Sequence, residues 1–210
     1  MSFLRVKICG ITNLPDALAA AELGADALGF VFYDKSARYI APDAARMIIR
    51  ELSPFAARIG VFVNQPETCI METVYRCGLS AVQLHGNEPA EFLRDSPVPV
   101  IRAIRVRDGT PIEMMRALRP GSAVLLDSYS PDAFGGTGVP FDWDIRGEWL
   151  SRYRIIIAGG LTEQNVRDAV ELFRPFGVDV SSGVESTPGI KDHDKIRRFI
   201  EAAKNSEVEK

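Results

Sequence analysis

Two side chains that can move protons stand at the ends of short apolar runs in this sequence. Cys9 follows RVKI near the amino terminus, and Asp127 follows AVLL in the second half of the chain. A thiol can act as a base or a nucleophile, and a carboxyl group can donate a proton. A buried structural cysteine and a turn-forming aspartate are the simpler alternatives. The presence of both groups at equivalent positions favours catalysis.

Two segments rich in glycine and serine predict a site for an anion. They are AGGL at 158–161 and SSGVE at 181–185, and each follows a β-branched apolar run. Glycines let a backbone approach a ligand closely, and exposed N–H groups can hold a phosphate. The run ending GVFVNQ at 60–65 has no such glycine pair, which favours one phosphate over two. We expect phosphate contacts from Gly159, Gly160, Ser181, Ser182 and Gly183.

Further polar candidates follow other apolar runs. Gln83 and His85 alternate in QLH and so share one face of a strand, where they could contact a substrate. The segment YDKSARYI offers Lys35 and Arg38, and an arginine can hold a carboxylate through two hydrogen bonds. The glycine-rich stretch 128–143 is long enough to cover a bound substrate. The sequence shows no metal-ligand cluster and no Ser-His-Asp order.

The elements that carry these residues alternate strictly between strand and helix. Short Val- and Ile-rich runs predict strands, and amphipathic stretches that open with Pro, Asp, Glu, Thr or Asn predict helices. The expected strands are 5–9, 26–32, 57–63, 80–85, 98–104, 122–127, 154–159 and 178–182. The expected helices are 13–24, 41–52, 66–77, 88–95, 111–119, 141–153, 162–174 and 191–204.

Eight repeats of strand and helix predict an α/β fold of the (β/α)8 TIM barrel class. We expect one domain over residues 1–204 and a frayed polar tail at 205–210. An open doubly wound sheet is the alternative, but it usually has a glycine-rich turn after its first strand, and CGITN has one glycine. In a barrel, the loops after the strands build the active site.

Barrel closure also predicts a buried ion pair. The first and last strands become neighbours, and alternation places Lys7 on the inward face with Cys9, and Asp179 with Ser181. A buried charge without a partner is costly, so we expect Lys7 and Asp179 to form a salt bridge below Cys9. The alternative is that Lys7 contacts the substrate or Asp127 while backbone amides hold Asp179.

The composition excludes several classes of function. The chain has 210 residues, 46% of them hydrophobic, and a net charge of −3, which argues against non-specific nucleic-acid binding. No apolar run is long enough for a membrane span, and the first residues lack the apolar core of a signal peptide. Three cysteines without CxxC spacing predict a reducing compartment, so we expect a cytoplasmic protein.

The motifs together resemble the phosphoribosylanthranilate isomerase family. The resemblance rests on KICGIT, GFVFYDKSARYI, VQLHG, LLDS, GGTGVPFDW, IAGGL and FGVDVSSGVESTPGIKDHDKI, which occur in order from residue 5 to about residue 196. It implies a stand-alone enzyme of tryptophan biosynthesis, without cofactor or metal, that binds a small phosphorylated substrate as a monomer or homodimer. The implied reaction converts N-(5-phosphoribosyl)anthranilate into 1-(2-carboxyphenylamino)-1-deoxyribulose 5-phosphate by an Amadori rearrangement.

The resemblance also assigns roles to residues of this chain. Cys9 corresponds to the general base, Asp127 to the general acid, and Arg38 to the arginine that binds the anthranilate carboxylate. Gly160 and Ser182–Gly183 correspond to the phosphate loops. Two alternatives stay open at this stage. A histidine-pathway sugar-phosphate isomerase would need a second phosphate site and a carboxylate in place of Cys9, and a non-catalytic sugar-phosphate-binding barrel would need neither Cys9 nor Asp127.

Overall fold

The computed structural model describes residues 4–106, 115, 118, 121–128 and 152–205. Its eight parallel strands form a closed barrel in the order β1 to β8, with β1 hydrogen-bonded to β8. This confirms the predicted TIM barrel and excludes the open sheet. The strands are β1 (Arg5–Cys9), β2 (Ala27–Val31), β3 (Ala57–Phe62), β4 (Ala81–Leu84), β5 (Val100–Val106), β6 (Ala123–Ser128), β7 (Arg154–Ile157) and β8 (Gly177–Val180).

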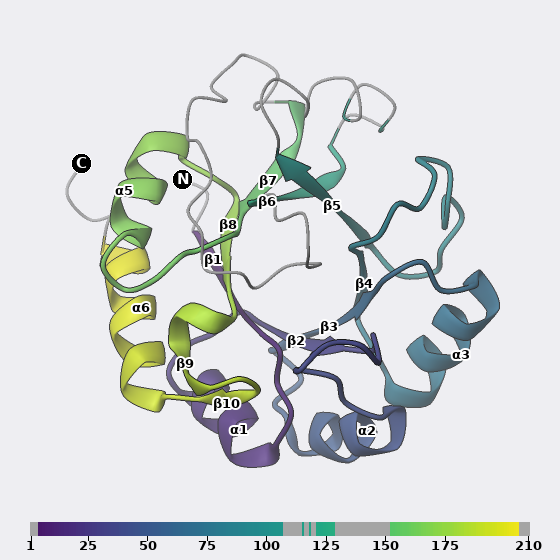
Figure 1. The fold of residues 1–210 in the computed structure, drawn as a ribbon, viewed down its shortest axis with the longest axis horizontal. Coiled ribbons are helices and arrows are strands. Elements are labelled where there is room, and N and C mark those ends of the chain that lie inside the picture. Colours follow the sequence, from purple (N-terminus) through teal and green to yellow (C-terminus); the bar gives the residue numbers. More distant parts are fainter. Residues whose placement is uncertain (1–3, 107–114, 116–117, 119–120, 129–151, 206–210) are drawn as a thin grey trace.

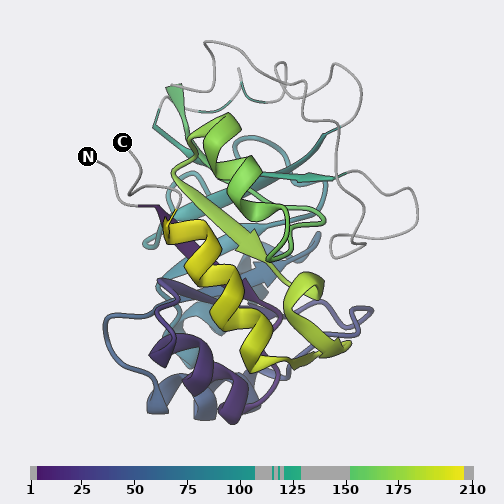
Figure 2. The same cartoon turned by 90° about the vertical axis from the view of Figure 1, so that its left-hand side faces the viewer.

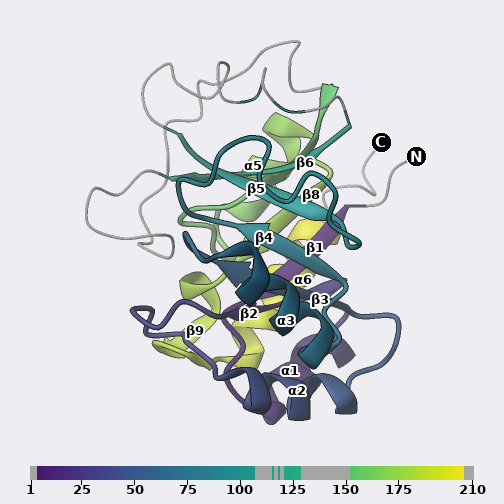
Figure 3. The same ribbon diagram turned by 90° about the vertical axis from the view of Figure 1, so that its right-hand side faces the viewer.

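Helices lie outside the strands, as the apolar stripe on each one requires (Figure 1). They are α1 (Leu14–Glu22), α2 (Pro42–Glu51), α3 (Glu67–Cys77), α5 (Val166–Phe173) and α6 (His193–Asn205). Helix α6 packs against α1 and α5 on one side of the barrel (Figure 2), and α3 lies on the opposite side (Figure 3). Nearly all of the predicted helices 111–119 and 141–153, of the flap at 128–143 and of the predicted tail lies outside the described residues.

The helix predicted at 88–95 is absent, and that prediction was wrong. The segment forms turns, and Leu93 adopts a φ of 59° that an α-helix does not allow. The buried guanidinium of Arg102 on β5 donates hydrogen bonds to the carbonyl oxygens of Glu88, Pro89, Ala90 and Phe92. These carbonyl groups are held by a side chain of the barrel wall, and the backbone forms turns, such as Phe92 N–H to the Pro89 carbonyl oxygen, in place of a regular helix.

The inside of the barrel is apolar at its lower end and polar at its upper end. Alternation along the strands directs Ala27, Ile59, Ala81, Ile101 and Leu125 into one interior cluster. Nearer the carboxyl ends, polar residues join the apolar ones on the inward face. Lys7, Gln83, His85, Asp127 and Asp179 are all buried there. The fold thus places its buried polar groups directly under the loops that follow the strands.

A short segment between β8 and α6 adds structure that the repeat pattern did not predict. It contains a single 3-10 turn at Ser182–Val184, followed by the antiparallel pair β9 (Glu185–Thr187) and β10 (Ile190–Lys191). The buried carboxylate of Asp16 on α1 accepts hydrogen bonds from the Lys191 backbone and the His193 ring, at 2.8 Å each. This anchor fixes the segment against the start of the barrel.

Candidate active site

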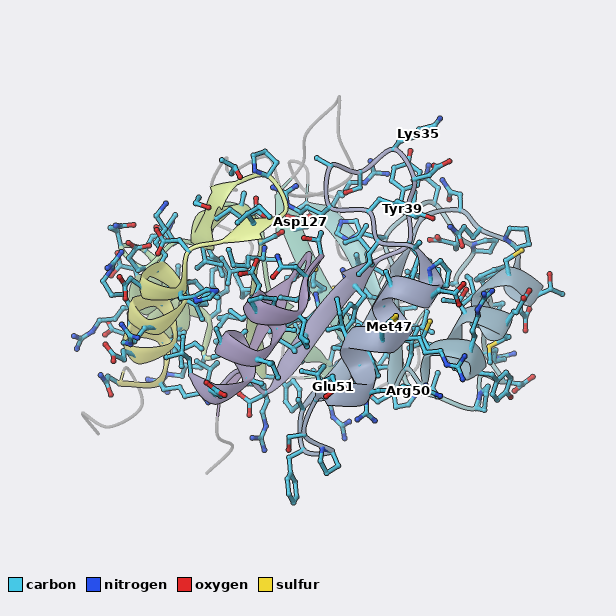
Figure 4. The ribbon with its side chains drawn as sticks, turned by 90° about the horizontal axis from the view of Figure 1, so that it is seen from below. Lys35, Tyr39, Met47, Arg50, Glu51 and Asp127 are labelled. Carbon is cyan, nitrogen blue, oxygen red and sulfur yellow. The ribbon has the colours of Figure 1, made fainter. Side chains whose placement is uncertain are left out.

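A pocket opens at the carboxyl ends of the strands and gathers the residues singled out in the sequence. It is lined by Cys9, Arg38, Gln83, His85, Asp127 and the segments 158–161 and 179–183. Figure 4 shows Asp127 at this end of the barrel, whereas Arg50 and Glu51 of α2 lie toward the other end. Lys35 is exposed and points away from the barrel, so Arg38 is the cation that the loop after β2 contributes to the pocket.

Below Cys9, the predicted ion pair is present. Lys7 Nζ lies 2.9 Å from Asp179 Oδ1, and both side chains are buried. Lys7 and Asp179 are paired in register across the β1–β8 seam, which explains why the two side chains meet. The Lys7 ammonium also lies close enough to the Cys9 thiol for each group to influence the pKa of the other. Burial disfavours the charge on Lys7, but Asp179 and Cys9 outweigh it, so the pKa of Lys7 lies above its usual value.

The same environment acts on the thiol in the opposite sense. Burial raises the pKa of Cys9, Lys7 opposes that rise, and Asp179 reinforces it. The net effect is a pKa above the ordinary thiol value. Lys7 favours the thiolate, as a neighbouring cation does, but burial is the stronger influence. Burial therefore favours the neutral thiol form of Cys9.

Gly29 on β2 makes the space that the thiol occupies. A Cβ atom at this position would lie 2.7 Å from Cys9 Sγ and 3.1 Å from Lys7 Cε. Gly29 is the register partner of Cys9 on the neighbouring strand, so any larger side chain would project into the same part of the barrel. The position of the thiol thus depends on the absence of a side chain at 29.

Across the pocket, Asp127 is held by a chain of hydrogen bonds from β4. His85 Nε2 lies 3.1 Å from Asp127 Oδ2, and Gln83 Nε2 lies 3.0 Å from His85 Nδ1. The two residues share one face of the chain, as alternation predicted. We expected Gln83 and His85 to contact the substrate. In the structure, Gln83 also contacts His85, and His85 contacts Asp127.

Arg38 is fixed by a residue that the sequence did not single out. Its Nε and Nη2 atoms donate to the two carboxylate oxygens of Glu185 at 2.8 and 2.7 Å. Lys191 Nζ lies 2.8 Å from the same carboxylate and 3.2 Å from the Ser181 carbonyl oxygen. Burial alone would raise the pKa of Glu185, but hydrogen bonds from Arg38 and Lys191 outweigh it and lower that pKa.

Glu185 and Lys191 were missed because their partners lie far away in sequence. Glu185 closes the motif SSGVE, but nothing in that motif points to Arg38, which is 147 positions away. The one available signal was an acidic residue directly after a predicted phosphate loop, where it would repel an anion unless a cation neutralised it. The cluster holds two cations and one carboxylate, so it keeps a net positive charge.

The two glycine-rich loops meet at the pocket. A Cβ atom on Gly183 would lie 1.9 Å from the Leu161 carbonyl oxygen, so only glycine permits this contact. Asn165 ties the first loop together, since its amide donates to the Gly160 carbonyl oxygen at 3.0 Å and accepts from Thr162 N at 2.8 Å. The predicted phosphate residues thus come from two segments that touch one another.

In the described part of the chain, neither a metal site nor a membrane-spanning helix accompanies this pocket. No three His, Cys, Asp or Glu side chains there gather closely enough to hold a metal ion. None of the described helices is both long and apolar enough to cross a membrane.

Comparison with known proteins places this arrangement in a family. The family model described as N-(5'phosphoribosyl)anthranilate (PRA) isomerase matches residues 6–202. The N-(5'-phosphoribosyl)anthranilate isomerase of Pelobacter propionicus is 52% identical over 206 residues, which cover 98% of each chain.

Two crystal structures of such enzymes share the fold. One is phosphoribosyl anthranilate isomerase in complex with reduced 1-(o-carboxyphenylamino)-1-deoxyribulose 5-phosphate, with a TM-score of 0.84, 48% identity, and coverage of 96% of this chain and 99% of that one. The other holds monomers generated from the dimeric enzyme of Thermotoga maritima, with a TM-score of 0.84, 46% identity, and coverage of 96% and 98%. The chain described here therefore belongs to the N-(5'-phosphoribosyl)anthranilate isomerase family.

Proposed function

We propose that this protein isomerises N-(5-phosphoribosyl)anthranilate to 1-(2-carboxyphenylamino)-1-deoxyribulose 5-phosphate in tryptophan biosynthesis. Family membership over nearly the whole chain supports the reaction. The observation that carries the assignment to this site is that one pocket holds Cys9, Asp127, Arg38 and two glycine-rich loops. A histidine-pathway isomerase is disfavoured, because it would need a carboxylate where Cys9 stands.

The substrate has an anion at each end, and the pocket offers a separate site for each. Glu185 engages the Nε and Nη2 side of the Arg38 guanidinium. A guanidinium carries five N–H donors, so its other edge can hold the anthranilate carboxylate. The net positive charge of the cluster favours that anion. The phosphate would bind the backbone N–H groups of the loops at Gly159–Gly160 and Ser181–Gly183, for which a phosphate is a suitable ligand.

In the first step, we assign Asp127 as the acid that opens the furanose ring. Its carboxyl proton passes to the ring oxygen as the bond from that oxygen to C1′ breaks. The bond electrons stay on the oxygen, and the nitrogen lone pair forms the C1′ iminium. Asp127 is left as a carboxylate that can accept a hydrogen bond from His85 Nε2. Such acid catalysis typically contributes about 10²- to 10⁴-fold to a rate.

In the second step, we assign Cys9 as the base that removes the C2′ proton. The electrons of the C2′–H bond form the C1′–C2′ double bond, and the iminium nitrogen accepts the displaced pair. The resulting enolamine tautomerises to the ketone product. Burial raises the pKa of the Cys9 thiol, so forming the thiolate requires additional positive charge beside it. The positive iminium beside C2′ supplies that charge, together with Lys7.

A direct assay tests the proposed function. Purified protein is mixed with freshly formed phosphoribosylanthranilate, and loss of the fluorescence of the anthranilate adduct is followed with time. We expect rapid loss with the wild type and almost none with Cys9→Ala or Asp127→Asn. Equal loss in all three samples would remove Cys9 and Asp127 from the mechanism. No loss with well-folded wild type would contradict the reaction itself.

We also propose that the protein forms a homodimer through the amino-terminal end of the barrel. Phe55, between α2 and β3, is 95% exposed. It borders a cavity of about 430 Å³ lined by the first residues of several strands, among them Val6, Ile101 and Ile156. A protruding aromatic ring beside an apolar cavity on the same face suits a two-fold interface, in which each ring enters the partner's cavity. The dimeric Thermotoga maritima relative supports this choice.

Light scattering tests the dimer. Phe55→Asp should produce a monomer with the wild-type turnover number, because Phe55 lies at the end of the barrel opposite to the pocket. Met47→Asp on α2 is the matched control, since Met47 is also exposed but lies outside the cavity, and this variant should stay dimeric. A dimeric Phe55→Asp variant, or a monomeric wild type at micromolar concentration, would contradict the proposal.

A cytoplasmic location is the last part of the proposal. All three cysteines are free thiols, which suits a reducing compartment. Cys69 is exposed and would be oxidised readily elsewhere.

A further inference from the structure

The hydrogen-bonded series Gln83–His85–Asp127 contains one atom without a partner among the described residues. All three side chains are buried, and the Oε1 atom of Gln83 accepts no hydrogen bond from the part of the chain that the structure describes. The amide uses its nitrogen instead, which faces His85 Nδ1 at 3.0 Å. A buried amide oxygen without a donor is unfavourable, so this orientation needs a reason.

The observed orientation fits one protonation state of the His85–Asp127 pair. A donating Gln83 nitrogen requires a lone pair on His85 Nδ1, so the proton of a neutral ring must sit on Nε2. That Nε2–H then donates to Asp127 Oδ2, so this oxygen carries no proton of its own. The structure with an unpaired Gln83 oxygen is thus the state in which the carboxyl oxygen that faces His85 has no proton to give.

The state that carries the proton needs the opposite amide orientation. If Asp127 Oδ2 gains a proton that it shares with His85 Nε2, the ring's own hydrogen must be on Nδ1. An Nδ1–H cannot face the NH2 group of Gln83. A half-turn of the Gln83 amide brings Oε1 to that position, where it accepts the Nδ1–H bond. The unpaired oxygen is the group that becomes paired when the acid is loaded.

We propose that Gln83 and His85 are positioning residues that keep the acid proton on Asp127, with the Gln83 amide turning as the His85–Asp127 pair gains or loses that proton. The inference rests on the proposed role of Asp127 as the acid. It assigns to Gln83 and His85 a function in proton supply that is separate from contact with the substrate. The proton that the pair gains or loses is exchanged with water or substrate in the pocket, which both His85 and Asp127 line, and the amide itself only turns.

Other charged groups face the same region and have partners of their own. Arg105 on β5 is the register partner of Asp127, and its Nη2 atom donates to Asn87 Oδ1 at 2.7 Å. On β1 and β8, Lys7 and Asp179 are paired at 2.9 Å, and Cys9 lies above them. On the β7 side, the described residues facing the pocket, 158–161, carry no charge. Each of these charged groups therefore has a partner other than His85 or Asp127.

Nitrogen-15 NMR of the histidine rings reads the two states directly. The chain has only two histidines, His85 and His193, so a His193→Gln variant assigns the signals. At high pH we expect His85 to show one bare nitrogen at Nδ1 and one N–H at Nε2. As the pH falls, Nδ1 should gain a proton in the same pH range in which kcat/KM rises along its alkaline limb. An Nδ1 that stays bare throughout that limb would overturn the inference.

Two substitutions at position 83 should move the alkaline limb in opposite directions. Gln83→Glu offers only acceptors while ionised and adds a negative charge beside the ring, so the proton is retained to a pH about one unit higher. Gln83→Met offers no acceptor for the Nδ1–H, so the limb should move about one unit lower. A residue that merely filled space would give shifts of the same sign or none, and either result would overturn the proposal.

The same substitutions at Gln65 are the matched control. The Gln65 amide donates to the Phe32 carbonyl oxygen at 2.6 Å, away from the His85–Asp127 pair, so Gln65→Glu and Gln65→Met should leave the pH profile unchanged. Failure of the inference is distinguishable from failure of the proposed function. If Asp127→Asn loses activity while both Gln83 variants keep the wild-type profile, Asp127 is the acid and Gln83 does not support it.

Discussion

The two sides of the pocket hold their reactive groups by different physical means. On the β1 and β8 side, Cys9 lies above the buried Lys7–Asp179 ion pair. On the β4 and β6 side, Asp127 ends a chain of buried hydrogen bonds that starts at Gln83. Charged side chains lie beside the base. The acid is instead hydrogen-bonded to a histidine, a residue whose protonation can change.

This difference follows from what each group must do. A thiol acts as a base only as a thiolate, and a fixed neighbouring cation favours that charged form. A carboxyl group acts as an acid only while it holds a proton, so a fixed cation in direct contact would oppose its function. Histidine can share the proton instead. The comparison predicts that variants on the two sides will respond differently to pH.

The largest expected effect comes from removing the reactive groups themselves. Cys9→Ala and Asp127→Asn should each lower kcat by roughly 10²- to 10⁴-fold or more, the range expected for loss of a base or an acid. Steady-state kinetics with circular dichroism to verify folding measure this effect. Wild-type turnover in either variant would contradict the assigned role of the replaced residue, and that side of the pocket would then have no catalytic group.

Loss of the ion pair should affect both stability and the thiol. Asp179→Asn leaves the buried Lys7 charge unpaired, so the free energy of unfolding should fall by about 3–5 kcal/mol. Asp179 raises the pKa of Lys7 in the folded state. The stabilisation from Lys7 is thus fully present below its unfolded pKa of about 10.4, and it is lost only as the pH rises through the higher folded value. Denaturant unfolding at pH 7 measures the loss, and unchanged stability would show that the pair contributes nothing.

The same pair makes opposite predictions for thiol reactivity. Asp179 raises the pKa of Cys9 and Lys7 lowers it. Asp179→Asn should therefore shift the alkylation of Cys9 by iodoacetamide to lower pH, and Lys7→Met should shift it to higher pH. The exposed Cys69 is replaced by serine in all samples, so that Cys9 is the remaining thiol that lines the pocket, while Cys77 is buried outside it. Shifts in the same direction would mean that the pair acts on the thiol through structure and not through charge.

Loss of the Glu185 carboxylate that holds Arg38 should mainly weaken substrate binding. Glu185→Gln removes one of the charges that fix Arg38, so KM should rise about tenfold while kcat changes less. The lowered pKa of Glu185 also predicts a pH effect. Its stabilisation is present above the unfolded pKa of about 4.3 and is lost as the pH falls through the lower folded value. Thermal melts at pH 3–7 should show this loss in the wild type only. A fall in kcat without a change in KM would contradict the role.

The smallest effect concerns the space around the thiol. Gly29→Ala forces Cys9 Sγ to move, because the new methyl group would lie 2.7 Å from it, so kcat should fall several-fold. Gly60→Ala is the control, since its methyl group would meet Leu79 Cδ1 at 2.5 Å, away from the pocket. The control should lose stability and keep its turnover number. Equal loss of turnover in both variants would remove the special role of Gly29.

The parts of the molecule that the sequence predicted are those fixed by strand alternation and closure. The β1 strand has the predicted bounds. Barrel closure makes Lys7 and Asp179 register partners on neighbouring strands, so their side chains meet inside the barrel. The parts it did not predict depend on side chains that reach across the fold. Arg102 donates hydrogen bonds to the backbone of the segment 88–92, and Glu185 accepts hydrogen bonds from Arg38. Local sequence spacing does not reveal either contact.

The contacts that support the base join the two ends of the chain. Lys7 and Asp179 are 172 positions apart, and Asp16 and Lys191 are 175 apart. A nascent chain that still lacks β8 would have to leave the Lys7 ammonium in water or bury it unpaired, and the second choice is unfavourable. Strand β1 can therefore take its final place only after the last strand has left the ribosome. The thiol thus acquires its ionic environment at the end of synthesis, when the barrel closes.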